Sequence, residues 1–259
     1  MEYNYPFIKK SFDDELPKAE IITKGENYIF SPIDISQTIH PEWLKFFSES
    51  GIDFNKRLKL LYKVGYENNL SVYPKPEECM KVFEMSPDEI RCVVIGQDPY
   101  PGWDKEKKRS VACGYSFATK SKTLPGSLDR IMESIKEKFG SIQMVDKETP
   151  YSLLGWIQQG VFLLNNTPVV YVNNDEKSQD DLKFIMSKPS LIWKGITSEI
   201  CKLISLRKSC PFILFGRDAE YLKVDVTKPE IESHPSKRND CEFRGECFLR
   251  IPIIKWNIM

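Results

Sequence analysis

The sequence predicts an α/β protein with three layers, α/β/α, around a central and mainly parallel four-stranded sheet. Short apolar runs have the length and composition of strands buried on both faces, and helical segments separate them. Strands that alternate with helices in this way form parallel sheets with crossover helices. Polar residues close the runs, so we expect these residues to meet at one edge of the sheet, where open α/β sheets bind ligands.

Length and composition favour one large domain. The chain has 259 residues, of which 41% are hydrophobic, and this is enough for a substantial core. We expect residues 1–60 to form an irregular or helical arm packed on the domain, and residues 61–259 to form the domain itself. Lys and Arg together number 37, as do Asp and Glu. Any DNA contact must therefore use local basic clusters, helix ends and backbone amides.

The seven cysteines show no metal-binding spacing. There is no CxxC pair, and Cys241 with Cys247 cannot supply the four ligands of a structural zinc site. Reduced, mostly buried thiols indicate an intracellular protein, of the nucleus or cytoplasm. Residues 1–18 lack the apolar segment of a secretory signal, and no run approaches the ~20 apolar residues of a membrane span. We expect neither secretion nor a membrane partner.

Helices are expected before the first strand. Apolar spacing predicts helices over 41–50 and 55–68, and His40 before the first of them is expected to be a surface residue. Two prolines within 72–76 predict a loop. A further helix is expected over 77–85.

The first predicted strand, residues 92–95, is followed by the polar pair Gln97 and Asp98. Gly96 ends the apolar run, and Pro99 prevents its continuation as a central strand. The pair therefore lies just past the carboxyl end of a buried strand. The alternative is a turn in which Asp98 only caps neighbouring backbone amides.

The segment after this strand is basic and then helical. Residues 101–113 predict either solvated surface or, because the expected pocket is adjacent, a phosphate contact. The basic residues of this loop are Lys105, Lys107, Lys108 and Arg109. Residues 127–139 carry an apolar stripe, and we expect Ser127 to cap this helix and Gly140 to end it.

Three more strands are predicted, and each is closed by a polar residue or glycine. A short helix over 153–159, a polar loop over 172–183 and a helix over 190–207 separate them. The runs and their closing residues are 161–164 with Asn165, 211–215 with Gly216 and Arg217, and 231–233 with His234.

A carboxylate, a carboxamide and an imidazole are thus expected at one edge of the sheet: Asp98, Asn165 and His234. Two aromatic residues, Tyr100 and Phe117, are near them in sequence or in the expected fold. His234 is one of only two histidines, and its place at the ligand-binding edge favours a catalytic role.

Ordered motifs of the chain resemble those of the family 1 uracil-DNA glycosylases. The likeness runs in register from about residue 70 to the C-terminus, and residues 1–60 contribute little to it. The main motifs are Gly96-Gln-Asp-Pro-Tyr100, Gly114-Tyr-Ser-Phe117, Gln159-Gly-Val-Phe-Leu-Leu-Asn165 and His234-Pro-Ser236. Further matches are Val72-Tyr-Pro74, Leu124-Pro-Gly-Ser-Leu128, Leu214-Phe-Gly216 and residues 252–256.

The resemblance implies an enzyme that flips deoxyuridine out of DNA and hydrolyses its N-glycosidic bond. Such an enzyme releases uracil and leaves an abasic site for base excision repair. By resemblance, Asp98 and His234 are catalytic: the carboxylate stabilises the oxocarbenium-like sugar and positions water, and the imidazole donates a hydrogen bond to uracil O2. The resemblance implies no metal, nucleotide or redox cofactor.

By the same resemblance, four residues bind the base. Asn165 pairs with N3–H and O4 of uracil, and Phe117 stacks on the ring. Tyr100 fills the space beside C5 and excludes the methyl group of thymine. The backbone of Gln97 assists His234 at O2.

Small or basic residues are expected to contact the DNA backbone: Ser127, Gly216, Arg217, Ser236 and Arg238. Serine hydroxyls and backbone amides allow the close approach of phosphates. The partner is uracil-containing DNA, single- or double-stranded, and the protein is expected to be a monomer. Contacts with replication proteins are a further expectation, because some departures from the common form resemble the branch found in large DNA viruses.

Those departures lie around the active-site motifs. Pro101 stands where His is usual, the loop 101–113 is longer and more basic, and Arg217 replaces a small Ser. Lys237 and Arg238 follow His-Pro-Ser, where the family has Pro and a Leu that wedges into the gap left by the flipped base. An Arg is a poorer hydrophobic wedge.

The alternative function is a glycosylase-fold module that binds DNA or serves a polymerase, with dispensable catalysis. Retention of all five site side chains argues against it: Asp98, Tyr100, Phe117, Asn165 and His234. A serine hydrolase is excluded by the absence of a GxSxG elbow.

Overall fold

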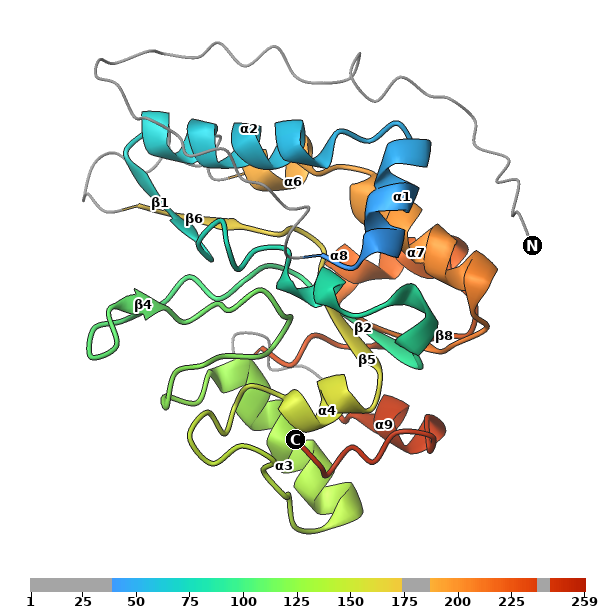
Figure 1. Cartoon of the computed structure of the whole chain (residues 1–259). Helices are drawn as coiled ribbons and strands as arrows, with labels where there is room; N and C mark the ends of the chain where they lie inside the picture. The colour runs from blue at the N-terminus through green and yellow to red at the C-terminus, as the bar shows by residue number, and fades with distance from the viewer. Residues whose placement is uncertain (1–38, 174–186, 237–242) are drawn as a thin grey trace.

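A four-stranded parallel sheet forms the centre of the molecule. The computed structural model describes residues 39–173, 187–236 and 243–259. The sheet order is β5-β2-β7-β8, and every neighbouring pair is parallel (Figure 1). The four strands are β2 (Cys92–Gly96), β5 (Val161–Asn165), β7 (Phe212–Phe215) and β8 (Pro229–Glu232). This confirms the predicted sheet.

The register brings the carboxyl ends of the strands to one edge. Gly96 at the end of β2 is opposite Asn165 at the end of β5. On the other side of β2, Val93 is opposite Phe212, so β7 runs alongside it in the same direction. The residues that follow β2, β5, β7 and β8 therefore emerge together.

Successive side chains of a strand point to opposite faces of the sheet, so the central strands contribute to two separate hydrophobic cores. Val93 and Ile95 belong to one core, and Cys92 and Val94 to the other. Every residue of β2 is buried. These strands are continuous apolar runs because helices cover both of their faces.

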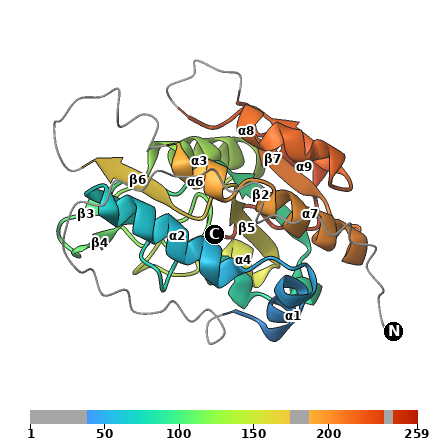
Figure 2. The same cartoon turned by 90° about the horizontal axis from the view of Figure 1, so that it is seen from above.

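Helices on the first face come from two segments far apart in the sequence, residues 41–67 and 188–207 (Figures 1 and 2). They are α1 (Pro41–Glu49), α2 (Phe54–Glu67), α6 (Lys188–Ile192) and α7 (Ile196–Arg207). The opposite face is covered by α3 (Gly126–Phe139), α4 (Leu154–Gln158) and α9 (Glu246–Arg250). The predicted three-layer arrangement is confirmed.

Two small antiparallel pairs flank the main sheet. β1 (Leu70–Tyr73) pairs with β6 (Val170–Asn173), where the sequence suggested loops at 72–76 and from 172. The loop predictions were wrong for residues 72–73 and 172–173, because pairing between two segments distant in the sequence makes strands of them. Residues 74–76 belong to no strand, and residues 174–183 lie outside the described residues. The second pair is the hairpin of β3 (Trp103–Asp104) and β4 (Arg109–Ser110), within the basic loop.

Three helix predictions need correction. The predicted helix over 77–85 consists of turns followed by the 3-10 helix η2 (Lys81–Glu84). The predicted helix over 190–207 is divided into α6 and α7 at Gly195, whose φ of 81° is the left-handed conformation that favours glycine. Helix α3 begins at Gly126 after Pro125, so Ser127 lies in its first turn and does not cap it.

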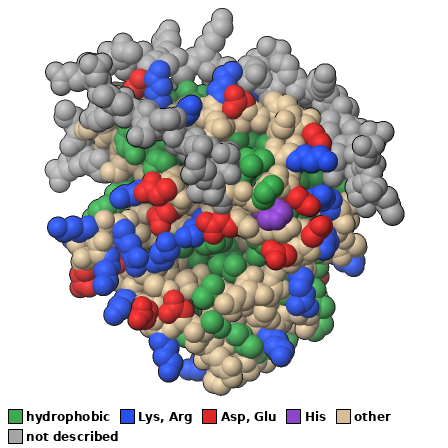
Figure 3. Space-filling model, in the orientation of Figure 1, with side chains coloured by type: hydrophobic (Ala, Val, Ile, Leu, Met, Phe, Trp, Pro, Cys, Tyr) green, Lys and Arg blue, Asp and Glu red, His purple; other side chains and the backbone are tan. Residues whose placement is uncertain are grey.

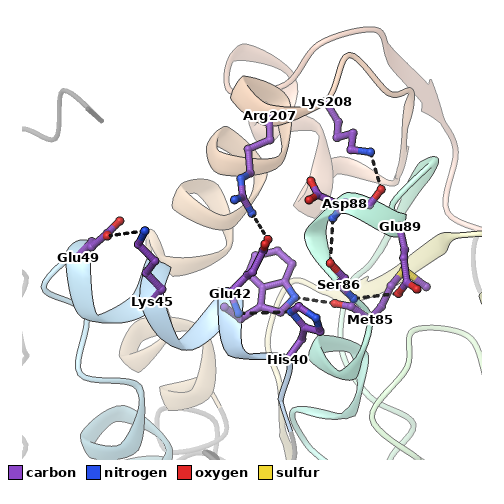
Figure 4. Close-up of polar contacts among 11 residues, drawn as sticks. His40, Glu42, Lys45, Glu49, Met85, Ser86, Asp88, Glu89, Arg207 and Lys208 are labelled. Atoms are coloured by element: carbon purple, nitrogen blue, oxygen red, sulfur yellow. Dashed lines mark hydrogen bonds and ion pairs between the residues drawn. The ribbon is translucent and has the colours of Figure 1, made fainter. Parts of the chain in front are cut away.

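The segment before α2 is anchored in the larger core (Figure 4). His40 accepts a hydrogen bond from the Glu42 backbone at the start of α1, and Glu42 pairs with Arg207 of α7 at 2.7 Å. Trp43 is fully buried; its Nε1 donates to the Met85 carbonyl at 2.8 Å. Residues 41–60 thus contribute to the core. Residues 1–38 lie outside the described residues, so the division at residue 60 stays a prediction.

The adjacent turn is closed by a second set of contacts. Ser86 and Glu89 form a capping box around η3 (Pro87–Glu89), and Lys208 Nζ donates to the Asp88 carbonyl (Figure 4).

The six cysteines of the described segments are buried and free, as expected for reduced thiols, and Cys241 lies outside those segments. None of the described helices combines the length and apolar character that a membrane span requires.

Candidate active site

Gly96 lets two predicted site residues meet at the end of β2. A Cβ on Gly96 would lie 2.9 Å from Oδ1 of Asn165 and 3.2 Å from Cε2 of Phe117. Both contacts are shorter than ordinary van der Waals distances, so the side chains of Asn165 and Phe117 fill the space that a larger residue would need. The carboxamide and the aromatic ring therefore lie against the same backbone atom.

Phe117 is buried, with 7% of its surface exposed. Its ring packs edge-on against Phe215 at the end of β7, with 5.2 Å between centroids. Its φ of 60° is a left-handed conformation that is uncommon outside glycine. The Tyr100 hydroxyl donates a hydrogen bond of 3.0 Å to the Phe117 carbonyl, and this bond joins the loop after β2 to the aromatic residue.

His234 completes the group from the loop that follows β8. Its ring centroid is 6.0 Å from that of Phe117. Gly216, after β7, allows this placement, because a Cβ on it would lie 2.9 Å from Cβ of His234. Loss of solvation lowers the pKa of His234, and Asp218 opposes this effect. The environment therefore favours the neutral imidazole.

Asp98 is held by the residues that follow Asn165. The Thr167 hydroxyl donates a hydrogen bond of 2.5 Å to Oδ1 of Asp98. The backbone N–H of Asn166 donates to the Gly96 carbonyl at 2.8 Å, and that of Thr167 donates to the Gln97 carbonyl at 3.2 Å. The parallel pairing of β2 and β5 thus continues beyond the strands and brings Asp98 beside Thr167.

The Asp98 side chain is open to solvent on one side, but the surrounding protein displaces enough water to affect its ionisation. Loss of solvation raises the pKa of Asp98, the Thr167 hydrogen bond lowers it, and the nearby Asp218 raises it. Asp218 therefore acts on both Asp98 and His234.

A cavity of about 390 Å³ borders this group on the Asp98 side. Gln97, Asp98 and Thr167 line one wall, and Arg217 and Asp218 line another. The cavity is open and more polar than apolar, so it can admit a hydrophilic chain such as a nucleic-acid backbone.

The predicted backbone-contact residues surround the same edge. Ser127 lies in the first turn of α3, where unpaired backbone amides favour anions. Gly216 and Arg217 begin the short helix α8 (Arg217–Glu220). Ser236 is two residues beyond His234, and its carbonyl accepts a hydrogen bond of 2.9 Å from Arg130 of α3. Arg238 lies outside the described residues.

Four residues of the site were not found by sequence reasoning. Asn166 Nδ2 donates to the Asp218 carbonyl at 3.2 Å, and Tyr221 donates to Asn166 Oδ1 at 2.9 Å. With Thr167, these residues link the segment after β5 to α8 and η4 (Tyr221–Val224). The position of Asn166 and Thr167 directly after a buried strand was an available signal, whereas Asp218 and Tyr221 had none.

No group of three or more His, Cys, Asp or Glu side chains in the described segments is arranged to hold a metal ion. The polar side chains of the site include one imidazole, His234, one carboxamide, Asn165, and two carboxylates, Asp98 and Asp218, of which Asp98 is held by a hydroxyl. This set suits recognition and charge stabilisation of a polar ring.

The chain is similar in sequence to bacterial proteins named uracil-DNA glycosylase. A uracil-DNA glycosylase of Amoebophilus asiaticus is 30% identical over 209 residues, which cover 76% of this chain and 84% of the relative. One from Streptococcus uberis is 30% identical over 204 residues, with the same coverage of 76% and 84%. No family model matches the chain.

The fold is also found in a solved structure, that of the mimivirus uracil-DNA glycosylase. The TM-score is 0.63 at 23% sequence identity, and the match covers 84% of this chain and 80% of the viral one. At this identity the likeness supports the fold alone. The curated bacterial relatives, which match most of their own length, go further: this chain belongs to the uracil-DNA glycosylase family.

Proposed function

We propose that Asp98, His234, Asn165, Phe117 and Tyr100 form the active site of this enzyme. The protein is a uracil-DNA glycosylase, a hydrolase that flips deoxyuridine out of DNA and cleaves its N-glycosidic bond. The observation that carries the residue assignment is the convergence of a carboxylate, a carboxamide and an imidazole. Asn165 and His234 lie beside Phe117, and Asp98, two residues after β2, is held by Thr167, two residues after Asn165, so all three come from the ends of different strands at one sheet edge.

Base recognition rests on Asn165 and Phe117. The amide of Asn165 can accept from N3–H and donate to O4 of uracil, whereas cytosine presents the inverted pattern and leaves both groups mispaired. Phe117 supplies a stacking face, and its contact with Phe215 prevents the ring from moving away. The close approach at Gly96 holds these two residues side by side.

Tyr100 would reject thymine by exclusion. Its hydroxyl is tied to the Phe117 carbonyl, so the phenol ring cannot swing aside at low cost. Burial raises the pKa of Tyr100, which keeps the hydroxyl protonated and able to donate that bond. A methyl group at C5 would meet a fixed ring.

Bond cleavage develops positive charge on the sugar and negative charge on the leaving base. Asp98, as a carboxylate, stabilises the sugar cation and orients the attacking water. His234 is held neutral by loss of solvation, and a neutral imidazole donates a hydrogen bond to uracil O2 as the anion forms. The proton balance is simple: water supplies hydroxyl to C1′ and a proton to the released uracil.

The backbone contacts would bracket the extruded nucleotide. Ser127 at the start of α3, Gly216 and Arg217 at the start of α8, and Ser236 all lie on elements that reach the carboxyl edge of the sheet. Arg238 is assigned to the same surface by its sequence position. That the enzyme is a monomer and that it contacts replication proteins stay predictions.

The test is uracil release from a single-stranded oligonucleotide that contains one deoxyuridine. Asp98→Asn should nearly abolish turnover while DNA binding is largely retained, and Asn165→Asp should relax selectivity towards cytosine. Asp88→Asn is the matched control, because Asp88 is an exposed carboxylate in η3, at the opposite edge of the sheet. If Asp98→Asn turned over as fast as wild type, the assignment would be wrong. If wild type bound DNA without releasing uracil, the accessory-module alternative would replace it.

A further inference from the structure

Trp103 is the one exposed tryptophan of this chain. Its exposed fraction is 43%, while the other four tryptophans, Trp43, Trp156, Trp193 and Trp256, are at most 3% exposed. It lies in β3, at the base of the hairpin inside the basic loop. The exposed part of a large aromatic ring offers a flat surface on which a nucleic-acid base can stack.

The Trp103 ring is supported by a stacking contact on one of its faces. Trp103 stacks on Tyr73 of β1, with 5.7 Å between centroids and 27° between planes. The hairpin pairs Trp103 with Ser110, and Asp104 Oδ1 accepts hydrogen bonds from the backbone N–H groups of Glu106 and Lys107. One face of the indole is thus covered by Tyr73, and the ring is a fixed platform.

The hairpin is also tied to the segment that precedes α3. The Arg109 guanidinium donates to the Lys120 carbonyl, and the backbone N–H of Val111 donates to the Gly102 carbonyl at 2.9 Å. The segment after Lys120 leads to the start of α3. The hairpin therefore does not swing freely, and a ligand bound on it would be placed relative to the active site.

Basic side chains surround the platform. Lys105, Lys107 and Lys108 at the hairpin tip are exposed, and none of them forms an ion pair with another described residue. With Arg109 the hairpin, residues 103–110, has four basic residues, and against them stand the two acidic residues Asp104 and Glu106, so its net charge is +2. Figure 3 shows basic side chains gathered over this hairpin and inward from it, on the face seen in Figure 1. The patch is positive although the whole chain has no net charge.

The platform is close to the catalytic residues along the chain. Trp103 follows Asp98 by five residues, which can span at most about 18 Å. A stacked nucleic-acid strand advances about 3.4 Å per nucleotide, so this reach corresponds to roughly five nucleotides. A strand whose deoxyuridine enters the site passes within reach of the hairpin.

We propose that Trp103 stacks on an unpaired base of the same DNA strand, a few nucleotides from the flipped deoxyuridine, while the three lysines contact its phosphates. The proposal rests on the function proposed above, because it takes the strand to pass Asp98. Bases in a duplex already stack on each other, so an exposed indole gains a partner only from unpaired bases. On this proposal the hairpin adds affinity for single-stranded DNA and little affinity for a duplex.

The test measures binding by a protein that does not cleave. In the Asp98→Asn background, dissociation constants are measured for a deoxyuridine oligonucleotide, single-stranded and as a duplex. Trp103→Ala should weaken single-strand binding by about 5- to 150-fold, the range for loss of one base–aromatic stack, and duplex binding by less than about twofold. Trp103→Phe should restore much of the loss. Leu206→Ala, an exposed apolar residue of α7, is the matched control.

Two further readouts separate stacking from simple charge attraction. Single-stranded DNA should quench tryptophan fluorescence in the Asp98→Asn protein and not in its Trp103→Phe derivative, because the other tryptophans are buried. Replacing Lys105, Lys107 and Lys108 with Gln should lower the slope of log K against log salt by about 2 for single strands. An abasic spacer at the stacked position should make Trp103→Ala indistinguishable from the parent protein.

The outcomes distinguish this proposal from the function on which it rests. Equal losses for single strand and duplex, or no loss at all with Trp103→Ala, would overturn the platform and leave the active site intact. Cleavage by Asp98→Asn at the wild-type rate would overturn the active-site assignment first. In the cleaving enzyme, Trp103→Ala should raise KM for single-stranded substrate and leave kcat within about twofold.

Discussion

The Thr167 hydroxyl donates a hydrogen bond of 2.5 Å to Oδ1 of Asp98, and no sequence motif predicted this pair. The carbonyl of Val169 lies farther from the same hydroxyl, at 3.3 Å, so the proton goes to Asp98. Thr167 is buried, and its backbone N–H also bonds the loop that carries Asp98. It orients the carboxylate and favours its ionised form.

Replacing Thr167 with valine should therefore shift the pH dependence of catalysis. Without the hydrogen bond the pKa of Asp98 rises further, because loss of solvation and Asp218 both act in that direction. Since the carboxylate is the active form, activity is lost as pH falls through this pKa, and the acid limb of kcat should move to higher pH. Near neutral pH we expect kcat to fall by about tenfold or more, because a hydrogen bond to a charged group is worth about 1.5–3 kcal/mol.

Thr167→Ser is the control, since it retains the hydroxyl and should keep the acid limb in place. KM should change little in both variants. A Thr167→Val enzyme with the wild-type pH profile would show that the hydroxyl does not act on Asp98 during turnover.

Removing the charge of Asp218 should have the opposite effect. Asp218 raises the pKa of both Asp98 and His234. In Asp218→Asn the carboxylate of Asp98 persists to lower pH, and His234 also stays neutral to lower pH. Both changes extend activity towards acid, so kcat on the acid limb should rise relative to wild type while kcat on the alkaline side of that limb is unchanged. The measurement is a pH–rate profile under saturating substrate.

Glu220→Gln provides the comparison, because Glu220 is another carboxylate of α8 but pairs with Lys223 at 3.0 Å. It should not move the acid limb. An equal shift in Glu220→Gln would mean that the general charge of the surface, and not Asp218, sets the profile.

Arg238 should make DNA binding steeply dependent on salt. An arginine where the family has a wedging leucine offers phosphate attraction in place of apolar insertion. Arg238→Leu should reduce the slope of log K against log salt by about 0.9 on duplex DNA and speed base flipping. Fluorescence anisotropy over a salt series measures the slope. Lys59→Leu, on α2, should leave it unchanged, and an Arg238→Leu slope as steep as wild type would contradict the prediction.

The packing of Trp43 predicts that residues 41–60 fold together with the domain. Its indole stacks on Phe162 of β5, at 5.4 Å between centroids, and donates to the Met85 carbonyl. Trp43→Ala should lower the free energy of unfolding by about 3–5 kcal/mol, the usual cost of emptying a large core site. Urea unfolding should remain a single transition. Leu44→Ala, only partly buried on the same helix, should cost much less. A loss below about 1 kcal/mol for Trp43→Ala would support a separate arm.

Sequence patterns were sufficient to locate the apolar runs in which every residue is buried. The continuous apolar runs of β2, β5 and β7 were located to within a residue or two, because a strand covered on both faces must be apolar throughout. Parallel strands put their carboxyl ends together, and this rule was enough to expect Asp98, Asn165 and His234 at one edge.

Contacts between segments that carry no such pattern became visible in the folded protein and could not be predicted beforehand. The β1–β6 pair, the division of α6 from α7 at Gly195, and the position of Ser127 within α3 were each predicted differently. The bond between Thr167 and Asp98 and the nearness of Asp218 were not predicted at all. Periodicity records which face of an element is buried, and it does so locally along the chain. Distances between side chains far apart in sequence depend on how the layers pack, which no local pattern encodes.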